Sequence, residues 1–184
     1  YDYRPLDVFV ATRLYIYMWY LSMDEHDLRR LLQFPNYDDW CTVQEGTCKG
    51  DQLHAAPWFR FVRDEFKDYA EQILAVNYAE ICRRLEVMRH DTGNPADWDI
   101  HHWQDINPLI CEGLVQLTLG APQPIYHGGL LHCRVRYFDP NSRRPGLPQN
   151  VAALVSTITP HNMRLYLVNL NPLKPSSVIL QLKA

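Results

Sequence analysis

The spacing of apolar residues changes once along this 184-residue chain, near residue 120, and that change most limits how the chain can fold. Before residue 120, apolar side chains recur every three or four positions, which is the period of amphipathic helices. After it come short runs rich in Val, Leu, Ile and Tyr, separated by Pro, Asn, Asp and Gly, as is typical of strands and turns. A block of helices followed by a block of strands predicts an α+β fold and disfavours a doubly wound α/β sheet.

Five helices are expected in the first part of the chain, over residues 6–21, 23–34, 51–62, 69–92 and 109–119. The second is expected to begin at Met23, because Ser22 and Glu25 have the spacing of a capping box. The fifth follows Asn107-Pro108, a helix cap and a first-turn proline. In the fourth helix the period places Arg83 and Arg84 outside. It places five apolar residues inside, namely Ile73, Val76, Ile81, Leu85 and Met88.

Four strands are expected in the second part, over residues 130–138, 151–158, 163–170 and 177–182. Short turns join them, which favours an antiparallel meander. The chain is therefore expected to contain a helical domain over residues 1–120, a Pro-rich connector over 121–129 and an antiparallel β lobe over 130–184.

Composition excludes several classes of protein. Eighteen basic residues against 21 acidic ones give a formal charge of −3, whereas a nucleic-acid groove needs a basic excess to neutralise phosphates. No apolar run reaches the roughly 18 residues of a membrane span. The five cysteines are scattered and form no Cys-x-x-Cys pair, so we expect reduced thiols in a cytoplasmic protein without a zinc knuckle, although Cys41 and Cys48 could close a loop disulfide.

Reactive groups are concentrated in residues 98–105, just before the expected fifth helix. This stretch holds the indoles of Trp98 and Trp103, the imidazoles of His101 and His102, and the carboxylates of Asp99 and Asp105. A carboxylate oriented against an imidazole is a common acid/base arrangement, and indoles beside carboxylates can form the stacking floor of a sugar site. The alternative, which the sequence leaves open and favours, is a loop in which Asp99 and Asp105 cap backbone amides and the tryptophans fill the core.

Glu112 is unusual because it is a carboxylate on a mostly apolar helix. It is expected either to face a cleft as a proton donor or to face solvent near the helix N-terminus. The adjacent Cys111 could act as a nucleophile, but core packing of its side chain is the simpler interpretation. His127, next to two glycines in the connector, could line a site between the two parts or mark a hinge.

A metal site is weakly indicated. The possible ligands are His101, His102, Asp105, His127 and His132, but neighbouring histidines in an extended segment point to opposite sides, and no His-Glu-x-x-His motif is present. We therefore predict neither a metal nor any other cofactor.

Two short segments carry resemblances to known proteins. Leu165-Tyr-Leu-Val-Asn-Leu-Asn-Pro172, followed by Ser177-Val-Ile-Leu-Gln181, resembles the β-sandwich strands that end many helical-toroid glycoside hydrolases and polysaccharide lyases. That resemblance implies a carbohydrate-related ancestry with a partial helical toroid or smaller bundle, and it carries no catalytic motif. Gln104 to Ile110 and Arg134 to Pro140 are similar to bacterial proteins that have no assigned function.

Three functions follow as hypotheses. The first is a glycosidase-like hydrolase, or a fragment of one, with a carbohydrate or other small-molecule substrate. In it Asp105 and Glu112 are acid and base, His101 or His102 positions them, and Trp98, Trp103, Asp99 and His127 contact the substrate. The second is a non-catalytic binding or assembly module, with homo-oligomers forming through the Tyr-rich first helix. The third is a metal-dependent hydrolase of esters or lactones.

Overall fold

The computed structural model describes residues 8–34, 42–43, 54–122 and 132–182. Within them, the helices come first and the strands last, so the predicted α+β class is confirmed. The helices are α1 (Val8–Ser22), α2 (Glu25–Leu31), α3 (Ala55–Val62), α4 (Tyr69–His90), the 3-10 turn η2 (Pro95–Asp97), α5 (Ile100–Ile106) and α6 (Glu112–Leu119). The strands are β1 (Val135–Asp139), β2 (Arg144–Pro145), β3 (Val151–Ile158), β4 (Met163–Asn169) and β5 (Ile179–Leu182).

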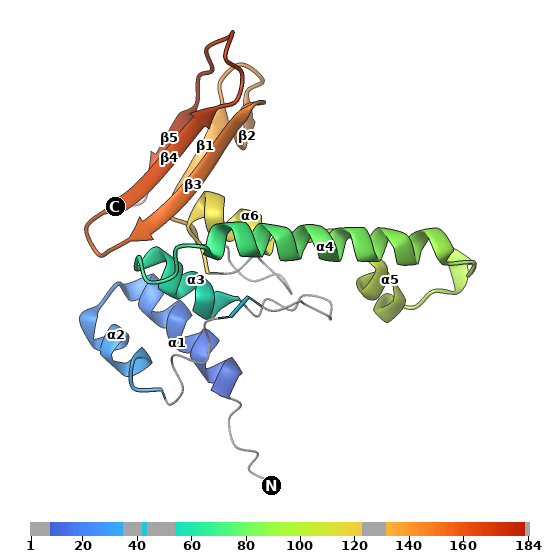
Figure 1. The fold of residues 1–184 in the computed structure, drawn as a ribbon, viewed down its shortest axis with the longest axis horizontal. Helices are drawn as coiled ribbons and strands as arrows, with labels where there is room; N and C mark the ends of the chain where they lie inside the picture. Colours follow the sequence, from blue (N-terminus) through green and yellow to red (C-terminus); the bar gives the residue numbers. More distant parts are fainter. Residues whose placement is uncertain (1–7, 35–41, 44–53, 123–131, 183–184) are drawn as a thin grey trace, which may run out of the picture.

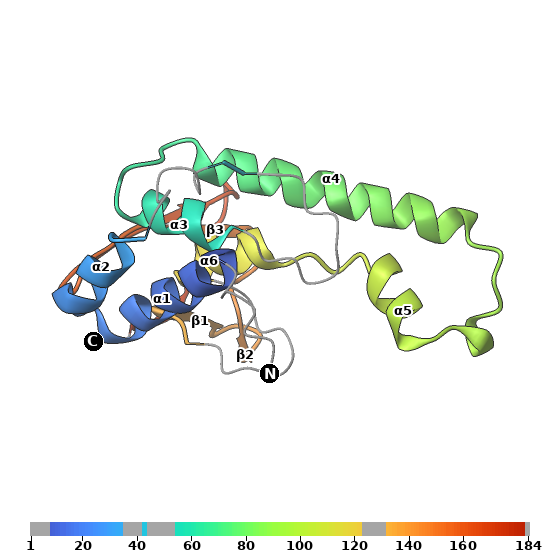
Figure 2. The same cartoon turned by 90° about the horizontal axis from the view of Figure 1, so that it is seen from below.

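The molecule has a compact body from which two parts project. Figure 1 shows α1, α2, α3 and α6 in the body, the strands rising from it on one side, and α4 extending away from it. Figure 2 confirms that α5 lies alongside the outer part of α4, so α4 and α5 together form an arm. Among the described residues, no helix combines the length and apolar character needed to cross a bilayer.

The core of the body is built around aromatic rings from α1 and α3. Trp19 and Tyr20 on α1 pack edge-to-face against Phe59 and Trp58 on α3, with centroid distances of 4.8 and 5.7 Å. All four rings are buried. Val155 of β3 and Val135 of β1 join this cluster, so the core is shared by the helices and the strands rather than belonging to the helices alone.

The start of α2 differs from the prediction. Ser22 is not the cap, because its hydroxyl donates to the carboxylate of Asp27 at 2.6 Å. Asp24 takes the role instead, and its carboxylate accepts from the backbone N–H of His26 at 2.6 Å. The helix therefore begins at Glu25, after Met23 has ended α1 with a left-handed φ of 54°.

The interior of α4 also differs from the prediction. Ile73 is buried as expected, but Leu85 and Met88 are exposed, because the outer half of the helix leaves the body. Arg84, expected outside, is buried, and its guanidinium donates to the carbonyls of Gln104 and Asn107 at 3.2 and 2.8 Å. Arg84 thus ties the end of α5 to α4.

The same contact explains why α6 begins later than predicted. The carbonyl of Asn107 is engaged by Arg84, and its side-chain oxygen accepts from the N–H of Leu109 at 2.9 Å. Residues 108–111 are consequently not helical, and the helix starts at Glu112. It ends at Gly120, whose φ of 60° is the left-handed conformation that favours glycine.

The strands form two antiparallel sheets, in the orders β2-β1-β5 and β3-β4. The predicted meander is therefore wrong, since β5 pairs with β1, from Val135 opposite Leu182 to Phe138 opposite Ile179. Of the four predicted strands, only β3 and β4 pair with each other as consecutive strands. Their hairpin carries a β-bulge between Val155 and Thr157. Of the predicted connector, residues 123–129 lie outside the described residues.

Candidate functional site

A cluster of buried polar side chains connects α3, α4 and α6. The Glu112 carboxylate accepts from the Nδ1 side of the His54 ring at 2.8 Å and from the backbone N–H of His54 at 3.2 Å. The two side chains are only 5% and 2% exposed. The Gln116 amide donates to Glu112 at 3.4 Å and to the carbonyl of Pro122 at 2.9 Å, and its oxygen accepts from the hydroxyl of Tyr69.

Burial also acts on the ionisable groups of this cluster and beside it. Burial raises the pKa of Tyr69 well above its ordinary value, and the nearby Glu112 carboxylate raises it further. Burial likewise raises the pKa of the Cys111 thiol, so this cysteine lacks the lowered pKa of a reactive nucleophile. On the other side of α6, the Gly113 N–H donates to Asn77 of α4 at 2.8 Å. The arrangement holds three helices together and satisfies their polar groups.

A second polar cluster lies at the outer end of the arm. The His102 ring bonds the Asp91 carboxylate at 2.6 Å and stacks obliquely on Trp98 at a centroid distance of 4.3 Å. Trp103 packs edge-on against Trp98 at 4.8 Å and remains 50% exposed. Asp99 caps α5 by accepting from the N–H of His102 at 2.8 Å, which lowers the pKa of Asp99. The predicted capping role of Asp99 is confirmed, but the predicted loop is wrong, because residues 100–106 form α5 and the half-exposed Trp103 does not fill the core.

The structure brings some of the predicted site residues together and separates others. Trp98, Asp99, His102 and Trp103 meet at the end of the arm, and His101 is exposed on the same helix. Asp105 is exposed on α5, where its charge acts on Arg83. Glu112 lies in the body instead, and Figures 1 and 2 show α5 and α6 at different places along α4. The proposed acid and base therefore have different surroundings and different partners.

The remaining residues that were predicted to bind a metal or a substrate do not extend these clusters. His127 lies outside the described residues, as do Cys41 and Cys48. The described part of the chain contains no group of three or more His, Cys, Asp or Glu side chains placed to hold a metal ion. The three described cysteines, Cys82, Cys111 and Cys133, are free thiols.

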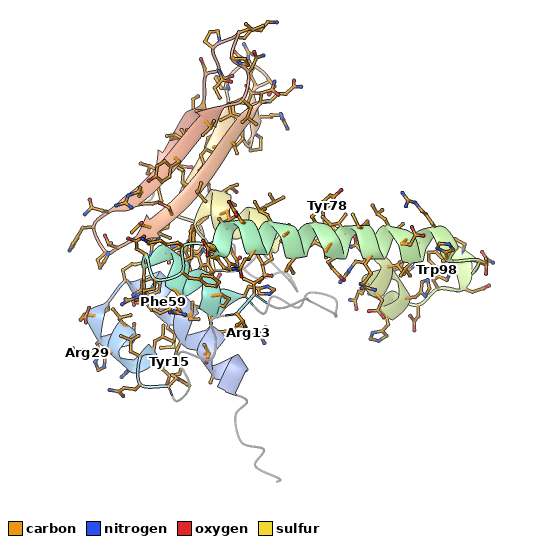
Figure 3. The ribbon with its side chains drawn as sticks, in the orientation of Figure 1. Arg13, Tyr15, Arg29, Phe59, Tyr78 and Trp98 are labelled. Atoms are coloured by element: carbon orange, nitrogen blue, oxygen red, sulfur yellow. The ribbon has the colours of Figure 1, made fainter. Side chains whose placement is uncertain are left out.

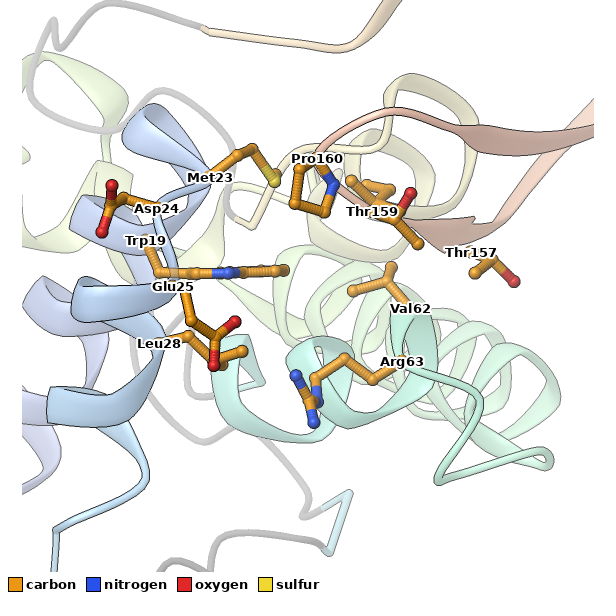
Figure 4. A pocket seen from close by; sticks show the side chains of 11 residues that line it. Trp19, Met23, Asp24, Glu25, Leu28, Val62, Arg63, Thr157, Thr159 and Pro160 are labelled. Atoms are coloured by element: carbon orange, nitrogen blue, oxygen red, sulfur yellow. The ribbon is translucent and has the colours of Figure 1, made fainter.

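A shallow pocket of about 240 Å³ lies between α1, α3 and the end of β3 (Figure 4). Its floor is Trp19, with Glu25 and Arg63 on the rim. The Arg63 guanidinium already pairs with Glu65 at 2.9 Å and lies over the Phe59 ring, so its charge is in use. The pocket is smaller than the 300–1,000 Å³ that small-molecule sites usually enclose. It is therefore a weak candidate for a ligand site.

A further candidate surface is a row of apolar side chains on α4. We call it the α4 stripe, and it consists of Leu74, Tyr78, Ile81, Leu85 and Met88. Their spacing of four, three, four and three residues is that of positions a and d in a heptad repeat. Tyr78 is 70% exposed, Leu74 43%, Met88 41% and Leu85 36%, and Ile81 is half-buried.

The stripe lies to one side of the groups that fix α4 to the rest of the chain. Asn77 and Arg84 point towards α6 and α5, and the 3.6-residue turn of the helix sets the stripe about a quarter turn from them. Figure 3 shows Tyr78 pointing away from α5, whereas Trp98 lies beside α5 at the end of the arm. The α4 stripe is thus a continuous apolar surface on a projecting helix, and it is the best candidate for a functional site.

The sequence pattern does not identify the α4 stripe, because it places Ile81, Leu85 and Met88 inside and assigns no role to Leu74 and Tyr78. The helical period does predict that one face of α4 is apolar, but it gives no means of telling a core face from a docking face. The signal that distinguishes them is the strict heptad spacing from Leu74 to Met88, which is narrower than the broad apolar arc of a helix packed in a core.

Comparison with known proteins gives one match. A family model with the description "Domain of unknown function (DUF8034)" matches residues 1–115, which include all of the arm and most of the helical body. No curated protein and no solved structure matches the chain. The predicted resemblance to proteins without an assigned function is confirmed in this broad sense. Because the match covers more than half of the chain, this protein belongs to the DUF8034 family.

Proposed function

We propose that this chain is a non-catalytic binding and assembly module, and that the α4 stripe is its docking surface. The observation that carries the proposal is a row of five apolar side chains at heptad spacing, four of them exposed and Ile81 half-buried, on a helix that projects from the body. Monomeric proteins rarely leave large contiguous apolar patches in water, and such patches often mark interaction sites.

The arm is built to present the stripe rather than to bury it. Arg84 fixes α5 against one side of α4, and the ion pair of Arg84 with Glu80 at 2.7 Å stiffens the same turn. A helix already held rigid loses little conformational entropy when a partner packs on it, which favours binding. The expected partner element is an amphipathic helix, because helices recognise one another through residues at this spacing.

The predicted oligomer surface on the first helix receives less support. Trp19 and Tyr20 of α1 are buried in the core, and Tyr15 packs against Phe34 at a centroid distance of 4.8 Å. Burial also raises the pKa of Tyr17. We therefore place the docking surface on α4, and homo-oligomerisation through α1 stays a prediction.

A photo-crosslinking experiment tests this function. The photoreactive amino acid p-benzoylphenylalanine replaces Tyr78, or in a control Gln72, which is exposed on nearly the opposite side of α4. Both variants are irradiated in the native host, and any adduct is identified by mass spectrometry. We expect one defined protein to be captured from position 78 and not from position 72. Adducts at neither position, or the same adducts at both, would show that the stripe docks nothing.

The second candidate is the glycosidase-like hydrolase predicted from the sequence. Its support is the arm-end cluster, where the half-exposed indole of Trp103 lies near the Asp91–His102 pair, because an exposed ring beside a carboxylate suits a sugar. The burial of Glu112 speaks against the proposed pair, since acid and base carboxylates must flank the bond from about 5–10 Å apart.

Chromogenic glycosides and esters test this candidate directly. Hydrolysis is measured for the parent, for Asp105→Asn and for Trp103→Ala, with Glu86→Gln as an exposed control on α4. A glycosidase with its site at the arm end loses its rate in the first two variants and keeps it in the control. Equal rates in all four proteins rule out a site there.

A further inference from the structure

We propose that the occupant of the α4 stripe is the same stripe of a second copy, packed antiparallel. This inference rests on the proposed docking function and adds the identity and orientation of the partner. It depends on the order of side chains along α4 and on the charges that flank them.

The stripe matches itself when the second helix runs in the opposite direction. In a helix pair of this kind, a positions lie opposite d positions. A two-fold axis at the middle of α4 sets Leu74 opposite Leu85 and Tyr78 opposite Ile81 of the second copy, and each contact occurs twice. At both ends, Met88 covers the methylene groups of Glu71. All five apolar side chains then have a partner.

The flanking charges favour the same orientation. Glu71 lies three residues before Leu74, at a further a position of the stripe, and Arg89 follows Met88 at the other end of the stripe. Both are exposed. Antiparallel pairing sets Glu71 beside Arg89 of the second copy at both ends of the pair. Parallel pairing in register sets Glu71 beside Glu71 instead, which is repulsive.

The position of the body at one end of α4 also favours antiparallel pairing. The body lies at the Tyr69 end of α4, and the far end carries only α5 (Figures 1 and 2). Antiparallel pairing therefore sets the two bodies at opposite ends of the helix pair, whereas parallel pairing sets them side by side. The stripe covers about two heptads and a length of about 21 Å, so we expect a concentration-dependent dimer rather than a permanent one.

Charge reversal tests the orientation. The single variants Glu71→Arg and Arg89→Glu and the double variant are compared with the parent by sedimentation equilibrium, and circular dichroism checks that each is folded. We expect each single reversal to raise the dimer dissociation constant about tenfold and the double variant to restore it. The two residues lie about 27 Å apart within one helix, so restoration requires contact between two copies.

The outcomes separate this inference from the docking function. A double variant that binds no better than the single variants overturns antiparallel pairing. A parent that stays monomeric at every concentration overturns the second copy as partner. If photo-crosslinking at position 78 still captures one defined protein, the docking function stands and the partner is a different chain.

Discussion

The polar cluster around Glu112 makes a quantitative prediction about stability. In Glu112→Leu, the carboxylate that accepts from the His54 backbone N–H and from its ring is replaced by a side chain of similar size that cannot accept a hydrogen bond. The backbone N–H remains buried because His54 is 2% exposed. The variant therefore keeps the buried donors and loses their acceptor.

The magnitude follows from the number of donors affected. A buried N–H without an acceptor costs about 1–3 kcal/mol, and the lost hydrogen bond to the ring costs about 1 kcal/mol more. Gln116 keeps its hydrogen bond to the Pro122 carbonyl at 2.9 Å, so the loss of its longer bond to Glu112 costs little stability. We expect Glu112→Leu to lower the free energy of unfolding by about 3 kcal/mol, the sum of the losses at the backbone N–H and at the ring. For a chain of this length that corresponds to a fall in Tm of about 6–12 °C.

Urea unfolding followed by circular dichroism measures this change. Glu112→Gln is the matched variant, because its oxygen still accepts from the His54 N–H and its amide can donate to the ring in the other neutral tautomer. We expect it to cost only about 1 kcal/mol. Glu86→Leu, at an exposed site, should change stability by less than about 0.5 kcal/mol. A Glu112→Leu protein as stable as the parent would refute the reasoning and return Glu112 to the candidates for catalysis, since functional groups often cost stability.

Three further predictions follow from other contacts. Arg84→Met should speed amide hydrogen exchange in residues 100–107 at least about tenfold by releasing two carbonyls, while Arg83→Met, at an exposed arginine, should not. Hydrogen bonds from Arg83 and, to a smaller extent, Arg84 lower the pKa of Glu80 from its ordinary 4.5. The contribution of Glu80 to stability is therefore complete above pH 4.5 and is lost as the pH falls through the lowered pKa. In urea unfolding, Glu80→Gln should destabilise the protein at pH 7 and have little effect near pH 2. Arg143→Gly should raise the free energy of unfolding by about 0.5–1 kcal/mol in the same assay, because Arg143 has a φ of 51°, and no gain would contradict this.

The fold class could be predicted because it depends on local patterns. The change from a helical to an alternating period near residue 120 is visible in the sequence alone, and α4, β3 and β4 lie close to their expected ranges. The errors have a common cause, which is contact between distant residues. Arg84 takes the carbonyl of Asn107 and delays the start of α6, and β1 pairs with β5 across more than forty residues. The neighbouring residues in the sequence indicate neither of these two contacts.

The candidate site was harder to predict because exposure is a tertiary property. Glu112 drew attention as a carboxylate on an apolar helix, but its partner His54 lies 58 residues away and was not considered. Trp98, Asp99, His102 and Trp103 lie together because they are neighbours in the sequence, whereas Asp91, which bonds His102, was overlooked because it lies eleven residues earlier. Leu85 and Met88 were expected inside because the sequence does not show where α4 leaves the body.

Sedimentation equilibrium of the parent beside a double variant of the α4 stripe, Tyr78→Glu with Leu85→Glu, tests the central claim most directly. Both side chains are exposed in the single chain, so the variant should fold normally, with Gln72→Glu as a control on the opposite side of the helix. We predict that the parent and the control reach twice the mass of one chain as concentration rises, and that the double variant stays at the mass of one. Equal association in all three proteins would mean that the stripe takes no part in assembly.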